Sequence, residues 1–90
     1  MITWDEPKRQ ANIKQHGIDF AGCEPIFDYP MVTVEDRREA YGKQRLQSLG
    51  FLNGCVVFVV WVDRQDAAHL ISVRAATKHE TRTYFKIISH

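Results

Sequence analysis

The Asn53-Gly54 pair restricts the fold of this chain more than any other feature of its sequence. It separates the stretch KQRLQSLGFL, residues 43–52, from the apolar stretch CVVFVVWV, residues 55–62. Asn and Gly accept the positive φ angles of a two-residue turn, so the pair predicts an antiparallel hairpin in which Arg45 lies opposite Val62. The apolar stretch is much shorter than the roughly 18 residues that a membrane helix needs, and it is typical of a buried strand.

Two further segments are predicted to extend this hairpin into an antiparallel sheet of about four strands. Residues 31–35, MVTVE, alternate in the manner of a strand, and a charged loop at 36–42, DRREAYG, connects them to the hairpin. Residues 68–76 follow a second turn and supply the remaining strand.

The second turn decides which side chains share a face of the sheet, because neighbours along a strand point to opposite sides. With Val62 opposite Ala68, Arg74 is expected to lie opposite Val56. One face is then the predicted core, and it consists of Leu46, Ser48, Gly50, Leu52, Cys55, Val57, Val59, Trp61, His69, Ile71, Val73 and Ala75. The other face is apolar in the middle yet includes Arg45 and Arg74, so the last helix or a partner is expected to cover it.

Two helices are predicted to precede the sheet. The first begins at Asp5, a capping residue, and ends near His16, where Gly17 stops it. Along it, Lys8, Asn12 and His16 recur at helical spacing, which indicates either a ligand-facing stripe or the solvent side. The second helix is expected over about residues 19–28, short or kinked because Gly22 and Pro25 weaken it.

A third helix is predicted after the sheet. Its start, TKHE, is a capping box in which the Thr77 and Glu80 side chains each bond the other residue's backbone N–H. The chain is therefore predicted to be a single α+β domain over residues 1–90, with two N-terminal helices packed on the sheet and a C-terminal helix after it.

The sequence favours no metal, cofactor or membrane segment. The four histidines have no His or Cys partner at ligand spacing, and no phosphate-binding glycine loop is present. Cys23 and Cys55 lie among apolar residues, which predicts two small buried side chains in a reducing cytoplasm. The N-terminal residues lack the apolar core of a signal peptide, so we expect a cytoplasmic protein.

Charge is distributed unevenly along the chain. The net charge is only +1, yet residues 67–90 hold four basic side chains and one acidic, while residues 19–39 hold six acidic and two basic. A nucleic-acid site must therefore be a local patch, and the alternative is an ordinary solvated surface.

The stretch SVRAATKHETRTYFK supplies residue types that suit metal-free cleavage of RNA. Such cleavage needs a general base, cations that stabilise charge on the phosphate, and an acid for the leaving oxygen. The candidates on the sheet face and the adjoining helix are Arg45, Arg74, Lys78, His79, Glu80, Arg82 and Tyr84. The structural alternatives are an ion pair for Arg74, helix capping for Glu80 and packing for Tyr84.

Three segments together resemble the BrnT toxins of bacterial type II toxin–antitoxin systems. They are WDEPKRQANIKQHGIDF, QRLQSLG and LISVRAATKHETRTY, and they extend over nearly the whole chain. The resemblance implies a fold similar to the RelE ribonucleases and a metal-independent endoribonuclease that blocks translation. It also implies a BrnA-type antitoxin, a ribbon-helix-helix protein through which the chain would act on operator DNA only indirectly.

Carried over position by position, the resemblance implies functional roles for Lys8, His16, Arg45, Arg74, Glu80 and Tyr84. The basic helix adds Lys78 and Arg82, and the eight residues fall into two groups. The predicted catalytic residues are Arg45, Arg74, Glu80 and Tyr84. The predicted RNA-binding residues are Lys8, His16, Lys78 and Arg82. Departures from the family pattern, such as the absence of histidine from residues 36–42, leave two alternatives open. These are an inactive co-repressor that only binds the antitoxin, and an RNA-binding module that does not cut.

Overall fold

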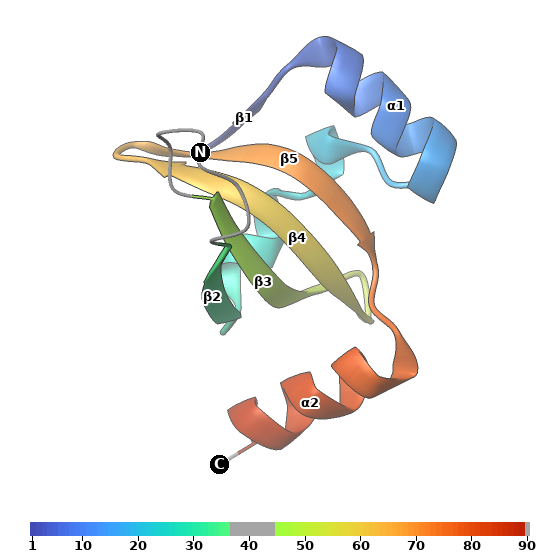
Figure 1. Ribbon diagram of the computed structural model, residues 1–90, viewed down its shortest axis with the longest axis vertical. Coiled ribbons are helices and arrows are strands. Elements are labelled where there is room, and N and C mark those ends of the chain that lie inside the picture. The colour runs from blue at the N-terminus through green and yellow to red at the C-terminus, as the bar shows by residue number, and fades with distance from the viewer. Residues whose placement is uncertain (37–44, 90) are drawn as a thin grey trace.

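The computed structural model describes residues 1–36 and 45–89, and the elements of these residues form an α+β fold (Figure 1). In chain order they are β1 (Ile2–Trp4), α1 (Glu6–His16), the short 3-10 helices η1 (Phe20–Gly22) and η2 (Glu24–Asp28), β2 (Val32–Asp36), β3 (Arg45–Leu52), β4 (Cys55–Arg64), β5 (Ala67–Ala75) and α2 (Lys78–Ile88). Within the described residues the strands form a five-stranded sheet in the order β1-β5-β4-β3-β2.

The predicted hairpin forms with the predicted register. Asn53 and Gly54 adopt φ angles of 50° and 82°, as the two-residue turn requires. Leu52 lies opposite Cys55, and Arg45 lies opposite Val62. The thiol of Cys55 is exposed at this turn, so the prediction that both cysteines are buried is wrong for Cys55 and holds for Cys23.

The sheet has one strand more than predicted, and it is mixed rather than antiparallel. Strand β1 pairs in parallel with β5, with Thr3 opposite His69. These first residues satisfy backbone groups that would otherwise lie on the open edge of β5. The short sequence ITW suggests a strand, but it contains no signal for its distant partner.

A second N-terminal α-helix is absent from the described residues, so that prediction is wrong. The segment forms η1 and η2 instead, with Asp19 capping η1 through a hydrogen bond from the Ala21 N–H. Pro25 lacks the N–H that a continuous helix would use, and Gly22 adds flexibility, so tighter turns replace the helix. The charged loop predicted at 36–42 lies, after Asp36, outside the described residues.

A β-bulge between β4 and β5 changes the predicted register. The turn pairs Val62 with His69 instead of Ala68, a difference of one residue. The bulge between Val60 and Trp61 adds a second residue, so that Phe58 rather than Val56 lies opposite Arg74. The extra residue on β5 reverses the direction of side chains on one side of the bulge. His69 therefore leaves the predicted core face, and Leu70 replaces it in the core with no exposed surface.

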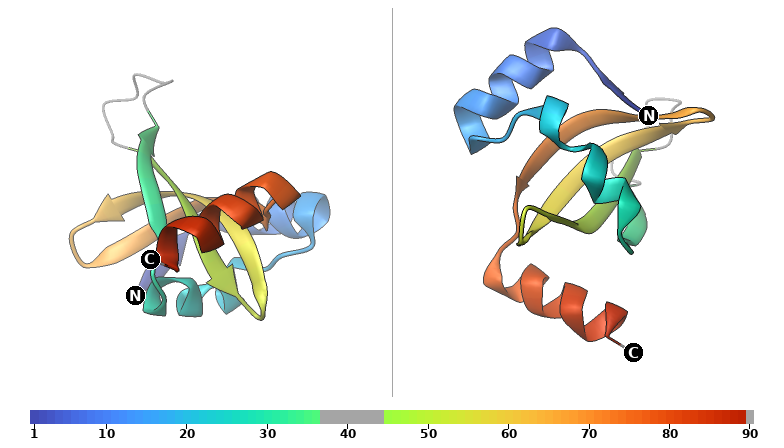
Figure 2. Two further views of the ribbon diagram at one scale, coloured as in Figure 1. Left: turned by 90° about the horizontal axis from the view of Figure 1, so that it is seen from below. Right: turned by 180° about the vertical axis from the view of Figure 1, so that it is seen from behind.

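The back of the sheet is covered chiefly by the 3-10 helices, whereas α2 lies against the face that bears Phe58 and Arg74 (Figure 2). The 3-10 helices lie over the back face, where Phe20, Cys23 and Ile26 are fully buried. Helix α1 packs along β5, and α2 crosses the end of the sheet near β2, β3 and β4. Among the described residues, no helix is long and apolar enough to cross a membrane.

Asn12 joins α1 to the sheet. Its side chain is only 4% exposed; it donates to the carbonyl oxygens of Ile18 and Val73, and accepts from the Val73 N–H. Neither alternative for the first helix, a ligand-facing stripe or a solvent side, describes this residue. Asn12 instead satisfies buried backbone groups, and it thereby fixes the position of Lys8 one turn earlier on α1.

Candidate functional site

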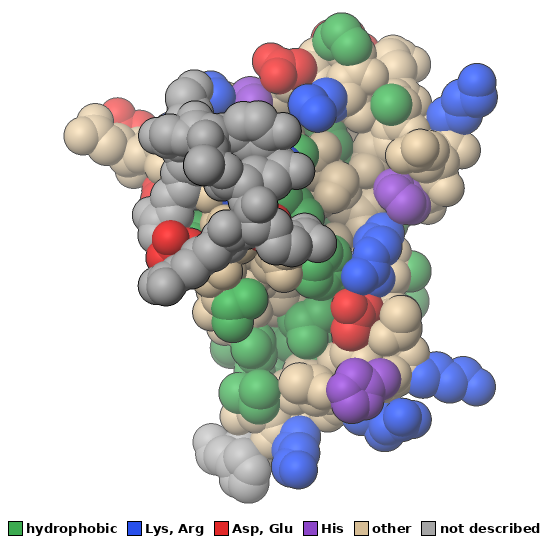
Figure 3. All heavy atoms as spheres, viewed as in Figure 1, with side chains coloured by type: hydrophobic (Ala, Val, Ile, Leu, Met, Phe, Trp, Pro, Cys, Tyr) green, Lys and Arg blue, Asp and Glu red, His purple; other side chains and the backbone are tan. Residues whose placement is uncertain are grey.

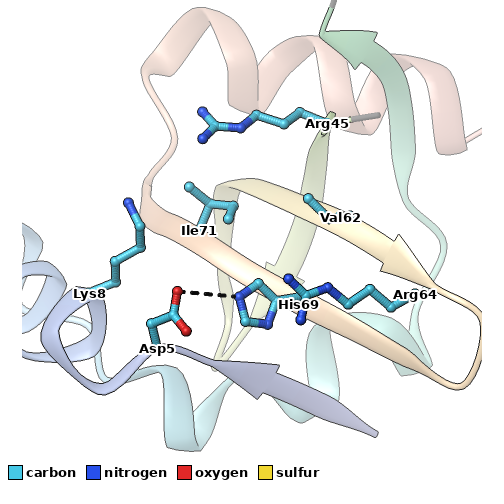
Figure 4. Close-up of a pocket in the computed structure, with 7 residues that line it drawn as sticks. All are labelled: Asp5, Lys8, Arg45, Val62, Arg64, His69 and Ile71. Carbon is cyan, nitrogen blue, oxygen red and sulfur yellow. Dashed lines mark ion pairs between the residues drawn. The ribbon is translucent and has the colours of Figure 1, made fainter. Parts of the chain in front are cut away.

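A pocket on the front of the sheet gathers charged residues from four separate elements (Figure 4). It has a volume of about 220 Å³ and is lined by Asp5, Lys8, Arg45, Val62, Arg64, His69 and Ile71. Asp5 is the residue just before α1 and Lys8 lies in its first turn. Arg45 comes from β3, Val62 and Arg64 from β4, and His69 and Ile71 from β5. Three of the seven are basic, so the pocket favours an anionic group such as a phosphate.

His69 lies at the base of this pocket and is only 5% exposed. One ring nitrogen, Nδ1, is 2.8 Å from the hydroxyl oxygen of Thr3. The other, Nε2, is 3.7 Å from a carboxylate oxygen of Asp5 on the pocket side. The imidazole is thus held on one side, while the nitrogen that can exchange a proton faces the cavity.

The side chain of Asp5 does not cap α1 as the sequence predicted. Asp5 occupies the capping position of α1 with an extended backbone, yet its side chain accepts no capping hydrogen bond. The carboxylate instead lies beside His69, with one oxygen 3.7 Å from Nε2. The positions of the Asp5 carboxylate and of the Lys8 ammonium are therefore both set by the residue at which α1 begins.

Arg74 and Glu80 form a second charged feature on the same face of the sheet. Arg74 pairs with β4 four residues before the position that pairs with Arg45. Two nitrogens of the Arg74 guanidinium donate to the two carboxylate oxygens of Glu80, each at 2.9 Å. The guanidinium also lies 4.3 Å from the centre of the Phe58 ring. The hydrogen bonds from Arg74 hold the pKa of the Glu80 carboxyl at about 2, well below its ordinary value.

The capping box is confirmed, and it includes this ion pair. The Thr77 hydroxyl accepts from the Glu80 N–H, and a Glu80 oxygen accepts from the Thr77 N–H. Glu80 thus caps α2 and binds Arg74 at the same time. Phe58 and Val62 are four residues apart on β4, so the backbones of Arg74 and Arg45 are offset by about 13 Å along the strands. Arg74 does not line the pocket that includes Arg45.

The other predicted site residues are scattered. Tyr84 is 1% exposed, and its hydroxyl donates to the carbonyl oxygen of Pro30. His16, at the far end of α1, is exposed and does not line the pocket. Lys78 and Arg82 are exposed on α2. Figure 3 shows Lys, Arg and His side chains following one side of this face from α1 to α2, beside a hydrophobic middle.

Of the eight predicted residues, the structure brings only Lys8 and Arg45 into the pocket. Sequence reasoning missed Asp5, Arg64 and His69 as site residues. A local signal existed for Asp5, since a carboxylate at a helix start is available to other partners. His69 had no such signal, because the bulge that turns it to the front depends on pairing with β4.

The described residues contain no group of three or more His, Cys, Asp or Glu side chains that could hold a metal ion. The pocket nevertheless contains the parts of an acid–base site, namely a histidine, a carboxylate beside it and several cations.

Comparisons with known proteins agree with the resemblance seen in the sequence. A family model described as the ribonuclease toxin BrnT of type II toxin–antitoxin systems matches residues 4–80, a range that includes every residue of the pocket. The crystal structure of the Brucella abortus ribonuclease toxin BrnT is similar, with a TM-score of 0.63 and 34% sequence identity over 86% of this chain and 96% of that chain. No curated protein sequence matches.

Proposed function

The chain belongs to the BrnT family of ribonuclease toxins of type II toxin–antitoxin systems, and we propose that it is a metal-independent endoribonuclease whose active site is the His69 pocket. The observation that carries this proposal is the position of the His69 ring. Its Nε2 faces a cavity bordered by Lys8, Arg45 and Arg64, so a base and phosphate-binding cations share one site.

In the proposed reaction the ribose 2′-oxygen attacks the adjacent phosphorus. The 2′-hydroxyl proton passes to Nε2 of His69 as the O–P bond forms. The bond from phosphorus to the 5′-oxygen then breaks, which leaves a 2′,3′-cyclic phosphate. The leaving 5′-oxygen takes a proton from water, and His69 later returns its own proton to solvent. Asp5 stabilises the imidazolium that exists between these two steps.

The cations have separate proposed roles. Arg45 presents a planar guanidinium to the reacting phosphate, where negative charge increases in the transition state. Lys8 and Arg64 border the same cavity and attract the neighbouring phosphates. Arg74, whose backbone is offset from that of Arg45 by about 13 Å along the strands, is proposed to contact a phosphate further along the RNA. Catalytic roles for Glu80 and Tyr84, and RNA binding by His16, Lys78 and Arg82, stay predictions of the sequence.

The biological setting is also part of this proposal. A cytoplasmic toxin of this kind blocks translation by cutting RNA, and an antitoxin of the BrnA ribbon-helix-helix type neutralises it. Operator DNA is then reached only through that antitoxin. The likeness to RelE ribonucleases implied by the sequence belongs to the same expectation.

A cleavage assay tests the proposal. The purified chain is incubated with a model RNA in the presence of a chelator, and products are examined for 2′,3′-cyclic phosphate ends. We expect cleavage by the wild type and a loss of about 10²–10⁴-fold in His69→Gln, the range for a general base. His79→Gln, which changes an exposed histidine on α2, is the matched control and should cut normally.

Two other outcomes distinguish the alternative functions. RNA binding without fragments, in a folded wild-type protein, would indicate a binding module. Tight binding of the antitoxin without cleavage or growth arrest would indicate an inactive co-repressor. Equal losses in His69→Gln and His79→Gln would remove His69 from the active site.

A further inference from the structure

The first strand brings a hydroxyl group to the back of the His69 ring. Strand β1 runs parallel to β5, and Thr3 lies opposite His69 in that pairing. The hydroxyl oxygen of Thr3 is 2.8 Å from Nδ1, although the two residues are 66 positions apart in the sequence. The family model matches from residue 4, so Thr3 lies just outside the matched range.

A neutral imidazole carries one ring proton, and the nitrogen that carries it decides what the ring can do. If the proton is on Nδ1, then Nε2 has a lone pair directed at the cavity and can accept a proton. If the proton is on Nε2, the ring can only donate there. The partner of Nδ1 therefore controls whether His69 is ready to act as a base.

Thr3 is suited to hold the proton on Nδ1. Its hydroxyl can accept from an Nδ1–H group or donate to a bare Nδ1, so the contact fits either neutral form of the ring. Only with the proton on Nδ1 does the same hydrogen bond persist after Nε2 has gained a proton, because both nitrogens of the imidazolium are donors. Asp5 is not an equal competitor, because 3.7 Å is too long for a hydrogen bond and its side chain is 65% exposed. The burial of His69 strengthens the shorter contact.

We propose that Thr3 is a positioning residue, whose hydroxyl holds His69 in the form that has Nε2 free to accept the 2′-hydroxyl proton. The catalytic part of this inference rests on the proposed function. It assigns a role to the parallel strand β1, since pairing with β5 is what places Thr3 against Nδ1.

The test compares Thr3→Val, which removes the hydroxyl but keeps the shape, with Thr3→Ser, which keeps the hydroxyl. We expect kcat for RNA cleavage to fall about 10–100-fold in Thr3→Val, by analogy with partners that orient metal-bound histidines. KM should hardly change, because the cations that bind phosphate are untouched. Thr3→Ser should restore most of the rate.

A matched control separates this role from general stability. Thr33 on β2 also bonds another side chain at 2.8 Å, the Ser48 hydroxyl, so Thr33→Val removes a comparable contact away from the pocket. We expect Thr33→Val to lower the melting temperature but leave kcat unchanged. An equal loss of kcat in Thr33→Val and Thr3→Val would overturn the positioning role.

Nitrogen-15 NMR of the imidazole gives a readout that does not require activity. The wild-type spectrum should show His69 protonated on Nδ1 when neutral, and Thr3→Val should move that proton wholly or partly to Nε2. An unchanged tautomer in folded Thr3→Val would refute the inference. If wild type cuts no RNA but the tautomer changes as expected, the proposed function fails while the control of His69 by Thr3 stands.

Discussion

Two charged regions on the front of the sheet differ in how closely an acidic and a basic side chain approach each other. At the start of α2, Arg74 and Glu80 make two hydrogen bonds of 2.9 Å, and the guanidinium lies against Phe58. In the pocket, Asp5 and His69 are 3.7 Å apart and border a cavity of about 220 Å³. The first pair is closed by its own contacts, whereas the second leaves room for a ligand.

This difference indicates why residue types alone and the tertiary structure favour different candidate sites. The sequence predicted most of the site residues within the stretch from Ser72 to Lys86, because it is rich in side chains that suit RNA cleavage. Within that stretch the Arg74–Glu80 pair mainly joins α2 to the sheet. The His69 pocket has fewer neighbours in sequence, yet its groups converge on one cavity, and convergence is what acid–base chemistry requires.

Among the substitutions that test the difference between the two regions, the largest effect on RNA cleavage is expected at Arg45. Arg45→Gln should lower kcat for RNA cleavage by about 10²–10³-fold, the usual cost of losing one donor to transition-state charge. Arg82→Gln, an exposed change on α2, should alter kcat little. Single-turnover cleavage at saturating RNA measures both. Similar rates for Arg45→Gln and wild type would place the chemistry outside the pocket.

A smaller effect is expected at Arg74, and mainly on stability. Arg74→Ala leaves the partly buried Glu80 without its partner, so the free energy of unfolding should fall by about 1–3 kcal/mol. RNA affinity should weaken modestly, while kcat at saturation stays close to wild type. Arg74→Lys should restore affinity better than stability, because an ammonium lacks the paired donors.

Denaturant unfolding and RNA titration measure these two quantities separately. A loss of about 10²–10³-fold in kcat by folded Arg74→Ala would contradict the mainly structural role of the Arg74–Glu80 pair. It would return Arg74 to the catalytic role that the sequence first suggested.

The smallest expected effect is the pH dependence of the Arg74–Glu80 pair. The pKa of Glu80 is lowered from 4.5 to about 2 in the folded protein, chiefly by hydrogen bonds from Arg74. The pair therefore stabilises the fold fully above about pH 4.5 and loses this contribution as the pH falls toward 2. We expect a loss on the order of 1–2 kcal/mol that Glu80→Gln does not show.

Unfolding curves of wild type and Glu80→Gln between pH 6 and pH 2.5 provide the measurement. The difference in stability between the two proteins should shrink as the pH falls. A constant difference across this range would mean that the ion pair contributes nothing measurable to the free energy of unfolding. The Arg74–Glu80 pair would then differ from the pocket in geometry but not in its contribution to stability.

The sequence by itself determined the features that depend on neighbouring residues. The Asn53-Gly54 turn fixed the register of β3 and β4, Gly17 ended α1 in the left-handed conformation, and Thr77 with Glu80 capped α2. Each of these relies on a backbone preference or a hydrogen bond within a few residues. The family resemblance was likewise visible in the sequence, because it rests on short motifs.

Only the tertiary structure decided how distant segments meet. The bulge opposite Val60 and Trp61 turned His69 to the front, and the parallel pairing of β1 placed Thr3 behind its ring. Burial of Asn12 fixed α1 on the sheet. These arrangements are set by packing and by hydrogen bonds between residues up to 66 positions apart, and nothing within a local window specifies them.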